Sequence, residues 1–193
     1  MIEPPRLLAF AGSARKGSYN KKLIRIATES AQRAGAQVTL IDLKDYPLPL
    51  FDQDLEQEHG LPENARKLKA LFRDHHSLLI AAPEYNSSIT PLLKNTLDWV
   101  SRAESTDEPP LSAYTGKMAV IMSASPGALG GLRGLVHLRA ILQNMGVIVL
   151  PGQRAIPAAH KIFTDDGQMT DEKLKQSIDF LGEELTRMTQ KLQ

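Results

Sequence analysis

The chain of 193 residues contains no cysteine. This absence excludes disulfides, a cysteine nucleophile, thiolate zinc sites and cysteine-ligated iron–sulfur clusters. An excess of charge of one sign is also lacking, because 23 Lys and Arg are balanced by 22 Asp and Glu and the formal net charge is +1. Proteins that bind a nucleic-acid backbone carry a markedly basic surface, so we expect no nucleic-acid partner.

Long hydrophobic runs are missing too. The longest apolar runs, near residues 118–122 and 146–150, have the length of a strand, whereas a membrane span needs about 20 residues. The segment Met1–Arg6 lacks the basic and apolar regions of a signal peptide. We therefore expect a single domain over residues 1–193, in the cytoplasm and without membrane contact.

Two kinds of segment alternate along the chain. The predicted strands cover residues 7–11, 37–42, 78–82, 118–123 and 147–150, and the predicted helices cover 20–34, 63–74, 91–102, 131–144 and 170–192. Apolar strands that alternate with amphipathic helices indicate a parallel sheet covered on both faces. The prediction is an α/β fold, a flavodoxin-like open sheet of five parallel strands in the order 2-1-3-4-5.

The helix predicted over 91–102 has a recognisable start, since Thr90 is a natural N-cap and Pro91 suits the first helical position. Trp99 falls at the margin of its apolar stripe, so this side chain either completes the core or anchors a subunit interface. Two polar connections, 45–62 and 103–116, are longer than usual for such folds. Long loops are often functional, but these two could equally be mobile connections without a function.

In open α/β sheets, ligands bind beyond the carboxyl ends of the strands where the strand order reverses. The first loop there, Gly12–Asn20, offers hydroxyls, an arginine fork and the free N–H groups of the next helix. The Walker A pattern fails because Ser18 stands where lysine is needed, and the dinucleotide pattern fails because Ala14 replaces its second glycine. A terminal monophosphate is left as the ligand, with an ordinary strand–helix turn as the alternative.

Two further loops end at the same edge. Pro83–Thr90 suits a planar ligand with carbonyl and ring-nitrogen acceptors, or is a turn that caps the next helix. Glu84 has no partner carboxylate or histidine at a useful spacing, so we expect no proton-transfer catalysis. Ser123–Gly131 lets the backbone approach a flat ring closely, or is a plain glycine turn. We expect solvated side chains at Arg133 and Arg139, and no metal site, because the five histidines show no ligand spacing.

These loops resemble the NAD(P)H-dependent FMN reductase family, and within it the branch of chromate or quinone reductases. The resemblance runs from about Leu7 to Pro157 and rests on three motifs, Gly12–Asn20, Pro83–Asn86 with Pro91–Asn95 and Asp98, and Ser123–Gly131. It implies non-covalently bound FMN, with NAD(P)H as co-substrate. The implied cofactor-binding residues are Ser13, Arg15, Ser18, Tyr19 and Asn20 around the phosphate, Pro83, Glu84, Tyr85 and Asn86 along the isoalloxazine, and Ser123, Ala124, Ser125, Pro126 and Gly127 at its other edge.

The resemblance also implies how the protein works. Chemistry takes place at N5 of FMN, so no side chain is predicted to be catalytic. Hydride from NAD(P)H reduces FMN, and a small oxidised acceptor then takes the electrons: a quinone, chromate, a ferric chelate, an azo compound or free flavin.

The resemblance also implies a homodimer or homotetramer through helix 91–102, which favours an interface role for Trp99 and Arg102. The alternatives are a flavodoxin-type electron carrier without its own NAD(P)H turnover, and a non-flavin regulatory domain of the receiver type.

Overall fold

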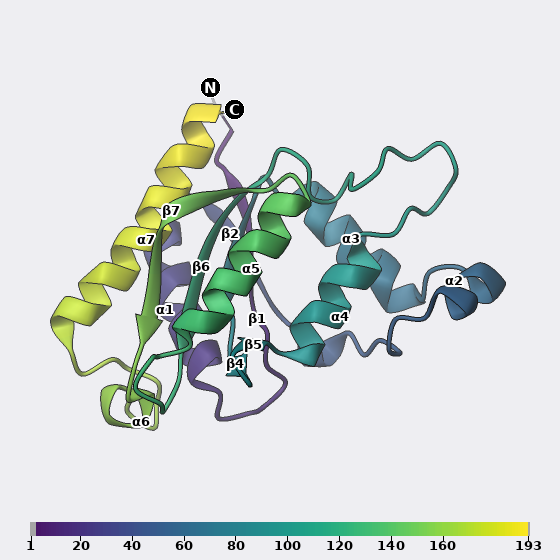
Figure 1. The fold of residues 1–193 in the computed structure, drawn as a ribbon. Helices are drawn as coiled ribbons and strands as arrows, with labels where there is room; N and C mark the ends of the chain where they lie inside the picture. The colour runs from purple at the N-terminus through teal and green to yellow at the C-terminus, as the bar shows by residue number, and fades with distance from the viewer. Residues whose placement is uncertain (1–2, 193) are drawn as a thin grey trace.

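The computed structural model describes residues 3–192, and its centre is a sheet of parallel strands (Figure 1). The five strands lie in the order β2-β1-β3-β6-β7, which confirms the predicted order 2-1-3-4-5. Their bounds are β1 Arg6–Ala11, β2 Gln37–Asp42, β3 Ser77–Ala81, β6 Met118–Ala124 and β7 Ile148–Ile156. A separate two-stranded hairpin, β4 Glu84–Tyr85 and β5 Ser88–Ile89, follows β3.

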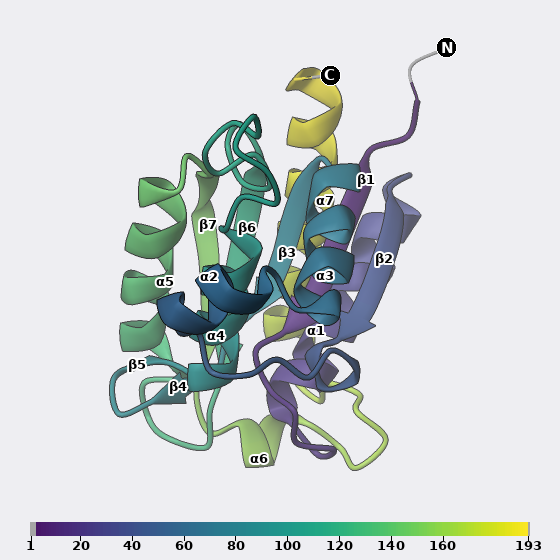
Figure 2. The same ribbon diagram turned by 90° about the vertical axis from the view of Figure 1, so that its right-hand side faces the viewer.

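Helices cover both faces of the sheet. Two of them, α1 and α7, lie on one face, and α3, α4 and α5 lie on the other (Figures 1 and 2). The bounds are α1 Tyr19–Arg33, η1 Leu43–Asp45, α2 Gln53–His59, α3 Glu63–Asp74, α4 Pro91–Val100, α5 Leu132–Asn144, α6 Ala159–Ile162 and α7 Glu172–Leu192. Within residues 3–192, no helix combines the length and the apolar character needed to cross a bilayer.

Side-chain alternation along β1 explains the two layers. Leu7, Ala9 and Ala11 join the buried cluster under α1 and α7, whereas Leu8 and Phe10 join the cluster under α3, α4 and α5. Successive residues of a strand point to opposite faces, so a strand covered on both sides must be apolar throughout. This is why the strands appear in the sequence as continuous apolar runs.

The largest difference from the predicted boundaries is in β7, which continues six residues beyond the predicted end at Leu150. The pairing with β6 shifts between Ala119 and Ile121, so β7 bulges around Pro151 and Gly152. An edge strand tolerates this, because one side of its backbone has no neighbouring strand. Arg139 stabilises the bulge by donating to the carbonyls of Val149 and Leu150 at 3.1 and 3.0 Å. The expectation of a solvated Arg139 was wrong.

Trp99 is fully buried within the chain. Its indole Nε1 donates to the carbonyl of Pro49 at 2.8 Å, and its ring meets the edge of Phe51 at 5.0 Å between centroids. This small cluster holds the connection 45–62, which contains α2, against α3 and α4. A side chain without exposed surface cannot anchor a second subunit, so the interface role favoured for Trp99 is replaced by a core role. Arg102 pairs with Glu56 of α2 at 2.8 Å within the same chain.

The second long connection, 103–116, is held by a buried ion pair. Lys69 of α3 lies 2.6 Å from Glu108, and their side chains are only 2% and 9% exposed. Glu108 also accepts hydrogen bonds from the amide of Glu104 and the hydroxyl of Ser112. Burial by itself would raise the pKa of Glu108, but these hydrogen bonds and Lys69 lower it to about 2.

Candidate functional site

The site lies at the carboxyl edge of the sheet, where β1, β3 and β6 are neighbours and their following loops meet (Figure 2). The first loop leads from β1 into α1. Ser18 is the N-cap of α1 in extended conformation, yet its side chain makes no capping hydrogen bond. Within residues 3–192 the amides of Tyr19 and Asn20 have no acceptor either. These free donors at the positive end of a helix form a site for an anion.

The side chains of Arg15 and Tyr19 lie next to each other in this loop. The guanidinium of Arg15 lies 5.7 Å from the centre of the Tyr19 ring, and the other side of the loop is supported by Phe163, whose ring stacks on Tyr19 at 5.9 Å. The Arg15 side chain is exposed and no acceptor within residues 3–192 holds its guanidinium. A charged donor is therefore available beside the free amides.

The side chain of Asn20 is engaged within the fold. Its side-chain amide donates to the carbonyl of Ala124 at 2.8 Å and accepts from the amide of Ala124 at 3.0 Å. This pair of hydrogen bonds is buried and joins the first turn of α1 to the end of β6. The side chain of Asn20 therefore fixes the first and third loops relative to each other, whereas its backbone amide is free to bind an anion.

The second loop folds into the β4–β5 hairpin. Asn86 and Ser87 occupy its two turn positions with φ of 48° and 69°, the conformation of a tight type I′ turn. Asn86 is exposed at the tip, away from the cavity that the three loops form. Asn86 reverses the chain in the hairpin turn and is not among the residues that line this cavity, so its contact with a planar ligand stays a prediction.

Glu84 connects the hairpin to α5. Its carboxylate accepts two hydrogen bonds from Arg133, at 2.9 and 2.6 Å, and one from the amide of Gly134 at 3.0 Å. Burial would raise the pKa of Glu84, but the Gly134 amide and the Arg133 guanidinium together lower it. Glu84 is thus a fixed anion, and Arg133 pairs with it while its own side chain stays 56% exposed, as expected for a solvated arginine.

The third loop begins where β6 ends. Ser123 is fully buried, and its hydroxyl has no hydrogen-bond partner within residues 3–192. Gly131 covers it so closely that a Cβ at this glycine would lie 2.0 Å from the Ser123 hydroxyl oxygen. Gly131 also has φ of 91°, a conformation that favours glycine. Ser123 therefore supports the loop from beneath.

The three loops enclose one small cavity of about 110 Å³. Most of the predicted site residues line it: Ser13, Arg15, Ser18, Tyr19, Asn20, Pro83, Glu84, Tyr85, Ala124, Ser125 and Pro126. The predicted residues Asn86, Ser123 and Gly127 do not. The amide of Gly127 is bonded to the hydroxyl of Ser125 at 3.1 Å, which closes a local turn. Tyr85 is 58% exposed beside the cavity and offers a flat apolar surface at its rim.

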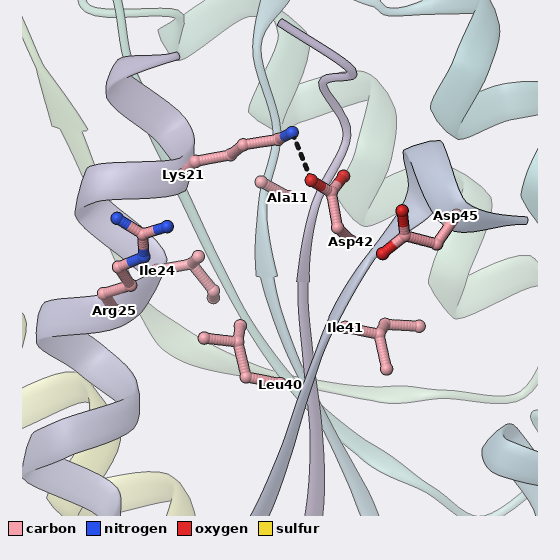
Figure 3. Close-up of a pocket in the computed structure, with 8 residues that line it drawn as sticks. All are labelled: Ala11, Lys21, Ile24, Arg25, Leu40, Ile41, Asp42 and Asp45. Carbon is pink, nitrogen blue, oxygen red and sulfur yellow. Dashed lines mark hydrogen bonds and ion pairs between the residues drawn. The ribbon is translucent and has the colours of Figure 1, made fainter. Parts of the chain in front are cut away.

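A neighbouring pocket lies between α1 and β2 (Figure 3). Its floor is apolar, with Ile24, Leu40 and Ile41, and an ion pair of 2.5 Å between Lys21 and Asp42 spans it. Although burial acts to raise the pKa of Asp42, its hydrogen bonds with Lys21 and with the Lys44 amide lower it. The charge of Lys21 is used in this pair, so the free positive charge of the loop before α1 depends on Arg15 and its neighbours.

Sequence reasoning missed two parts of this site. The segment after β7, which carried no usable motif, brings Phe163 against Tyr19, and Lys22 of α1 donates to the carbonyl of Thr164 at 2.6 Å. The hydrogen bonds from Arg133 and Gly134 to Glu84 were missed too. Residue spacing does not show that α5 begins beside the hairpin. Within residues 3–192, no group of three or more His, Asp or Glu side chains is placed to hold a metal ion.

An open α/β sheet in this strand order, with an anion loop and a flat-ring surface at its switch point, defines a flavodoxin-like nucleotide-binding protein. The family model of NADPH-dependent FMN reductases matches residues 5–161, so the chain belongs to that family, whose members use FMN with NAD(P)H as electron donor.

Relatives agree with this assignment. A probable NADPH:quinone oxidoreductase 2 from rice (Oryza sativa) is 34% identical over 90% of this chain and 83% of its own length. A quinone reductase of Escherichia coli is 32% identical over 96% and 94%. Among solved structures, a flavoenzyme NAD(P)H:(acceptor) oxidoreductase from Paracoccus denitrificans superposes with a TM-score of 0.81 at 25% identity, covering 97% and 98% of the two chains. The chain is thus similar to redox enzymes over nearly its whole length.

Proposed function

We propose that the protein is an FMN-dependent oxidoreductase that takes electrons from NAD(P)H and delivers them to quinones. The observation that carries the proposal is the single cavity formed by three loops from three separate strands, with unused donors on the α1 side and an aromatic rim on the other. Chromate, ferric chelates, azo compounds and free flavin are further acceptors of the same proposal. Bound FMN would accept hydride and pass on electrons.

The phosphate end of the ligand would be held by the first loop. The amides of Tyr19 and Asn20, the hydroxyls of Ser13 and Ser18 and the fork of Arg15 supply neutral and charged donors for its oxygens. A phosphate at this point also faces the positive end of the α1 dipole. No acidic side chain of the first loop opposes it.

The ring end would lie against Pro83, Glu84 and Tyr85, with Ala124 to Pro126 along its other edge. Glu84 cannot exchange protons easily, because Arg133 and the Gly134 amide hold it as an anion. Its role in the proposal is therefore positional: it fixes the hairpin that forms the wall of the site. That no side chain is catalytic stays a prediction.

Donor and acceptor would use the site in turn, because bound FMN is first reduced by NAD(P)H and then reoxidised by the acceptor. The exposed ring of Tyr85 at the rim would accept many flat molecules without strict selection.

Assembly into a homodimer or homotetramer through residues 91–102 stays a prediction, and Trp99 is not its contact. Location in the cytoplasm stays a prediction as well.

Anaerobic reduction tests the proposal. The FMN-loaded protein is mixed with NADH or NADPH, the loss of flavin absorbance is followed, and a quinone is then added. We expect fast reduction by at least one nicotinamide and reoxidation by the quinone. If neither nicotinamide reduces the bound flavin at a useful rate, the alternative of a flavodoxin-type carrier is correct. If the protein incubated with FMN retains no flavin absorbance after gel filtration, the flavin site itself is refuted.

A further inference from the structure

A second cavity lies at the opposite, amino end of the sheet. It has a volume of about 280 Å³, and its lining includes Arg73 at the end of α3, His76, Thr115 and Lys117 before β6, and Leu192 of α7. It shares no residue with the cavity of the proposed flavin site. No acidic residue is part of its lining within residues 3–192.

Lys117 is the central feature of this cavity. It is only 9% exposed, and its ammonium group donates to the backbone carbonyl of His75. No carboxylate within residues 3–192 lies within 4.0 Å of it. An ammonium group has three donors, so two are left over. Burial lowers the pKa of Lys117 to about 8, although Asp74 nearby acts in the other direction.

A second buried lysine of the same molecule, Lys69, has both a carbonyl and a carboxylate as partners. Lys69, with a side chain 2% exposed, meets the carboxylate of Glu108 at 2.6 Å and also donates to the carbonyl of Arg102. Buried charges in proteins are normally paired in this way, because an uncompensated charge away from water is costly. Within residues 3–192, Lys117 has the carbonyl of His75 as a partner but no carboxylate within 4.0 Å, and Asp74 acts on it only from a distance.

Two further cations, Arg6 and Arg73, lie near Lys117. The pKa of His76 is lowered by burial and then by the neighbouring cations Arg6 and Lys117. Arg73 is exposed at the rim. Among residues 3–192, the acidic groups that face this end are Asp74 and Glu3, and Glu3 already lies 3.6 Å from Arg6.

Neighbouring groups do not use the remaining Lys117 donors. Both ring nitrogens of His75 are engaged elsewhere, because Nδ1 lies 2.6 Å from the carbonyl oxygen of Leu71 and Nε2 lies 2.7 Å from the Thr39 hydroxyl. The carbonyl of Asp74, at the end of α3, is engaged by the guanidinium Nε of Arg6 at 2.7 Å. Within residues 3–192, the cavity is thus a small space lined by the buried Lys117, with Arg73 at its mouth and no acidic residue in its lining.

We propose that this cavity binds a small oxyanion of the phosphate or sulfate class, with Lys117 as its buried charged anchor and Arg73 at the mouth. The anion would supply the acceptor that Lys117 lacks, as Glu108 does for Lys69. A tetrahedral oxyanion suits the site because ammonium and guanidinium donors can reach separate oxygens. The ligand is either the free ion or the phosphate group of a small ester.

Calorimetric titration of the FMN-loaded protein at pH 7 tests this site, since bound FMN keeps the probe out of the first loop. The probes are inorganic phosphate, sulfate and glycerol phosphate. We expect saturable binding to the wild type, at least tenfold weaker binding to Lys117→Met, and roughly threefold to tenfold weaker binding to Arg73→Gln. Lys67→Met, which removes an exposed lysine of α3, is the matched control and should bind as the wild type does.

Tighter binding of the ester would identify a phosphorylated metabolite as the ligand, and equal binding would identify the free ion. Absence of saturable heat with all three probes overturns the proposal. So does equal binding by Lys117→Met and Lys67→Met. If Lys117→Met does not fold, Arg73→Gln decides, because its exposed side chain is not needed for folding; unchanged binding there refutes the site. None of these outcomes depends on electron transfer.

Discussion

Two connections of this molecule, both polar and both singled out in the sequence, turn out to be opposites. The loop before α1 leaves the Ser18 hydroxyl and the amides of Tyr19 and Asn20 without partners. The connection 103–116 leaves little unused: Glu108 alone accepts from Lys69, Ser112 and the Glu104 amide. In the first connection, hydrogen-bond donors lack acceptors within the fold. In the second, the charge of Glu108 is paired with Lys69 of the same chain.

This difference separates binding from support. Polar groups that the fold satisfies itself hold the chain in place, and their removal costs stability. Polar groups that the fold leaves free and aims into a cavity serve a ligand, so their removal should cost affinity with little loss of stability. Length and polarity alone do not distinguish the two cases. The following substitutions test the distinction.

The largest effect is expected at Lys69. Lys69→Met leaves the buried carboxylate of Glu108 without its ammonium, and breaking one partner of a buried pair costs about 3–5 kcal/mol. Urea unfolding measures the change. Lys67→Met, on the same helix but in an exposed pair with Glu63, should change stability by less than about 1 kcal/mol. Equal effects of the two substitutions would mean that the 103–116 connection is not held by this pair.

Arg15 should show the reverse behaviour. Arg15→Ala removes a charged donor from the proposed phosphate site, which should weaken FMN binding about tenfold to a hundredfold and leave the urea midpoint nearly unchanged. Flavin fluorescence titration measures the affinity. Lys16→Ala, which removes the adjacent exposed cation, should weaken binding much less. An unchanged dissociation constant in Arg15→Ala would remove this residue from the site.

Asn20 combines both kinds of role and so sharpens the comparison. Asn20→Ala leaves the buried amide and carbonyl of Ala124 unsatisfied, which should cost about 1–3 kcal/mol of stability. FMN affinity should fall as well, because the first and third loops lose their link. Asn144→Ala, at the exposed end of α5, is the control for both measurements. Loss of affinity without loss of stability would mean that Asn20 contacts the ligand directly.

The smallest effect is the pH dependence of the Glu108 contribution. Because the folded state lowers the pKa of Glu108 from 4.5 to about 2, its stabilisation is complete above pH 4.5 and is lost as the pH falls towards 2. The difference in urea midpoint between wild type and Glu108→Gln should therefore stay constant from pH 7 to 5 and become smaller below 4.5. A difference that does not change down to pH 3 would contradict the assigned role of this carboxylate.

Much of the fold was accessible from the sequence because local signals agree with tertiary packing. The β2 range and the α3 range match the predicted bounds, and the side chain of Thr90 caps α4 as predicted, accepting from the amide of Leu93 at 3.2 Å. The bulge in β7 was missed because Pro151 and Gly152 normally end a strand, and only an edge position with Arg139 on its carbonyls allows the strand to continue.

The candidate site was predictable as far as topology determines it. Parallel strands bring the loops after β1, β3 and β6 to one edge, so most of the predicted residues share a cavity. Individual side-chain roles were less accessible. The Asn20 side chain forms hydrogen bonds with the amide and carbonyl of Ala124 at the end of β6. Asn86 reverses the chain at the tip of the β4–β5 hairpin. Such roles depend on contacts between segments distant in sequence.

The sequence by itself determined the alternation of strand and helix, the three loops and the family, since periodicity and short motifs are local properties of the chain. Only the tertiary structure decided which polar groups are satisfied. Trp99 and Lys69 are engaged by partners within the fold, whereas Ser18, Arg15 and Lys117 keep donors for something else. The physical reason is that the demand for hydrogen bonds belongs to each residue, but its fulfilment depends on neighbours that folding brings from elsewhere in the chain.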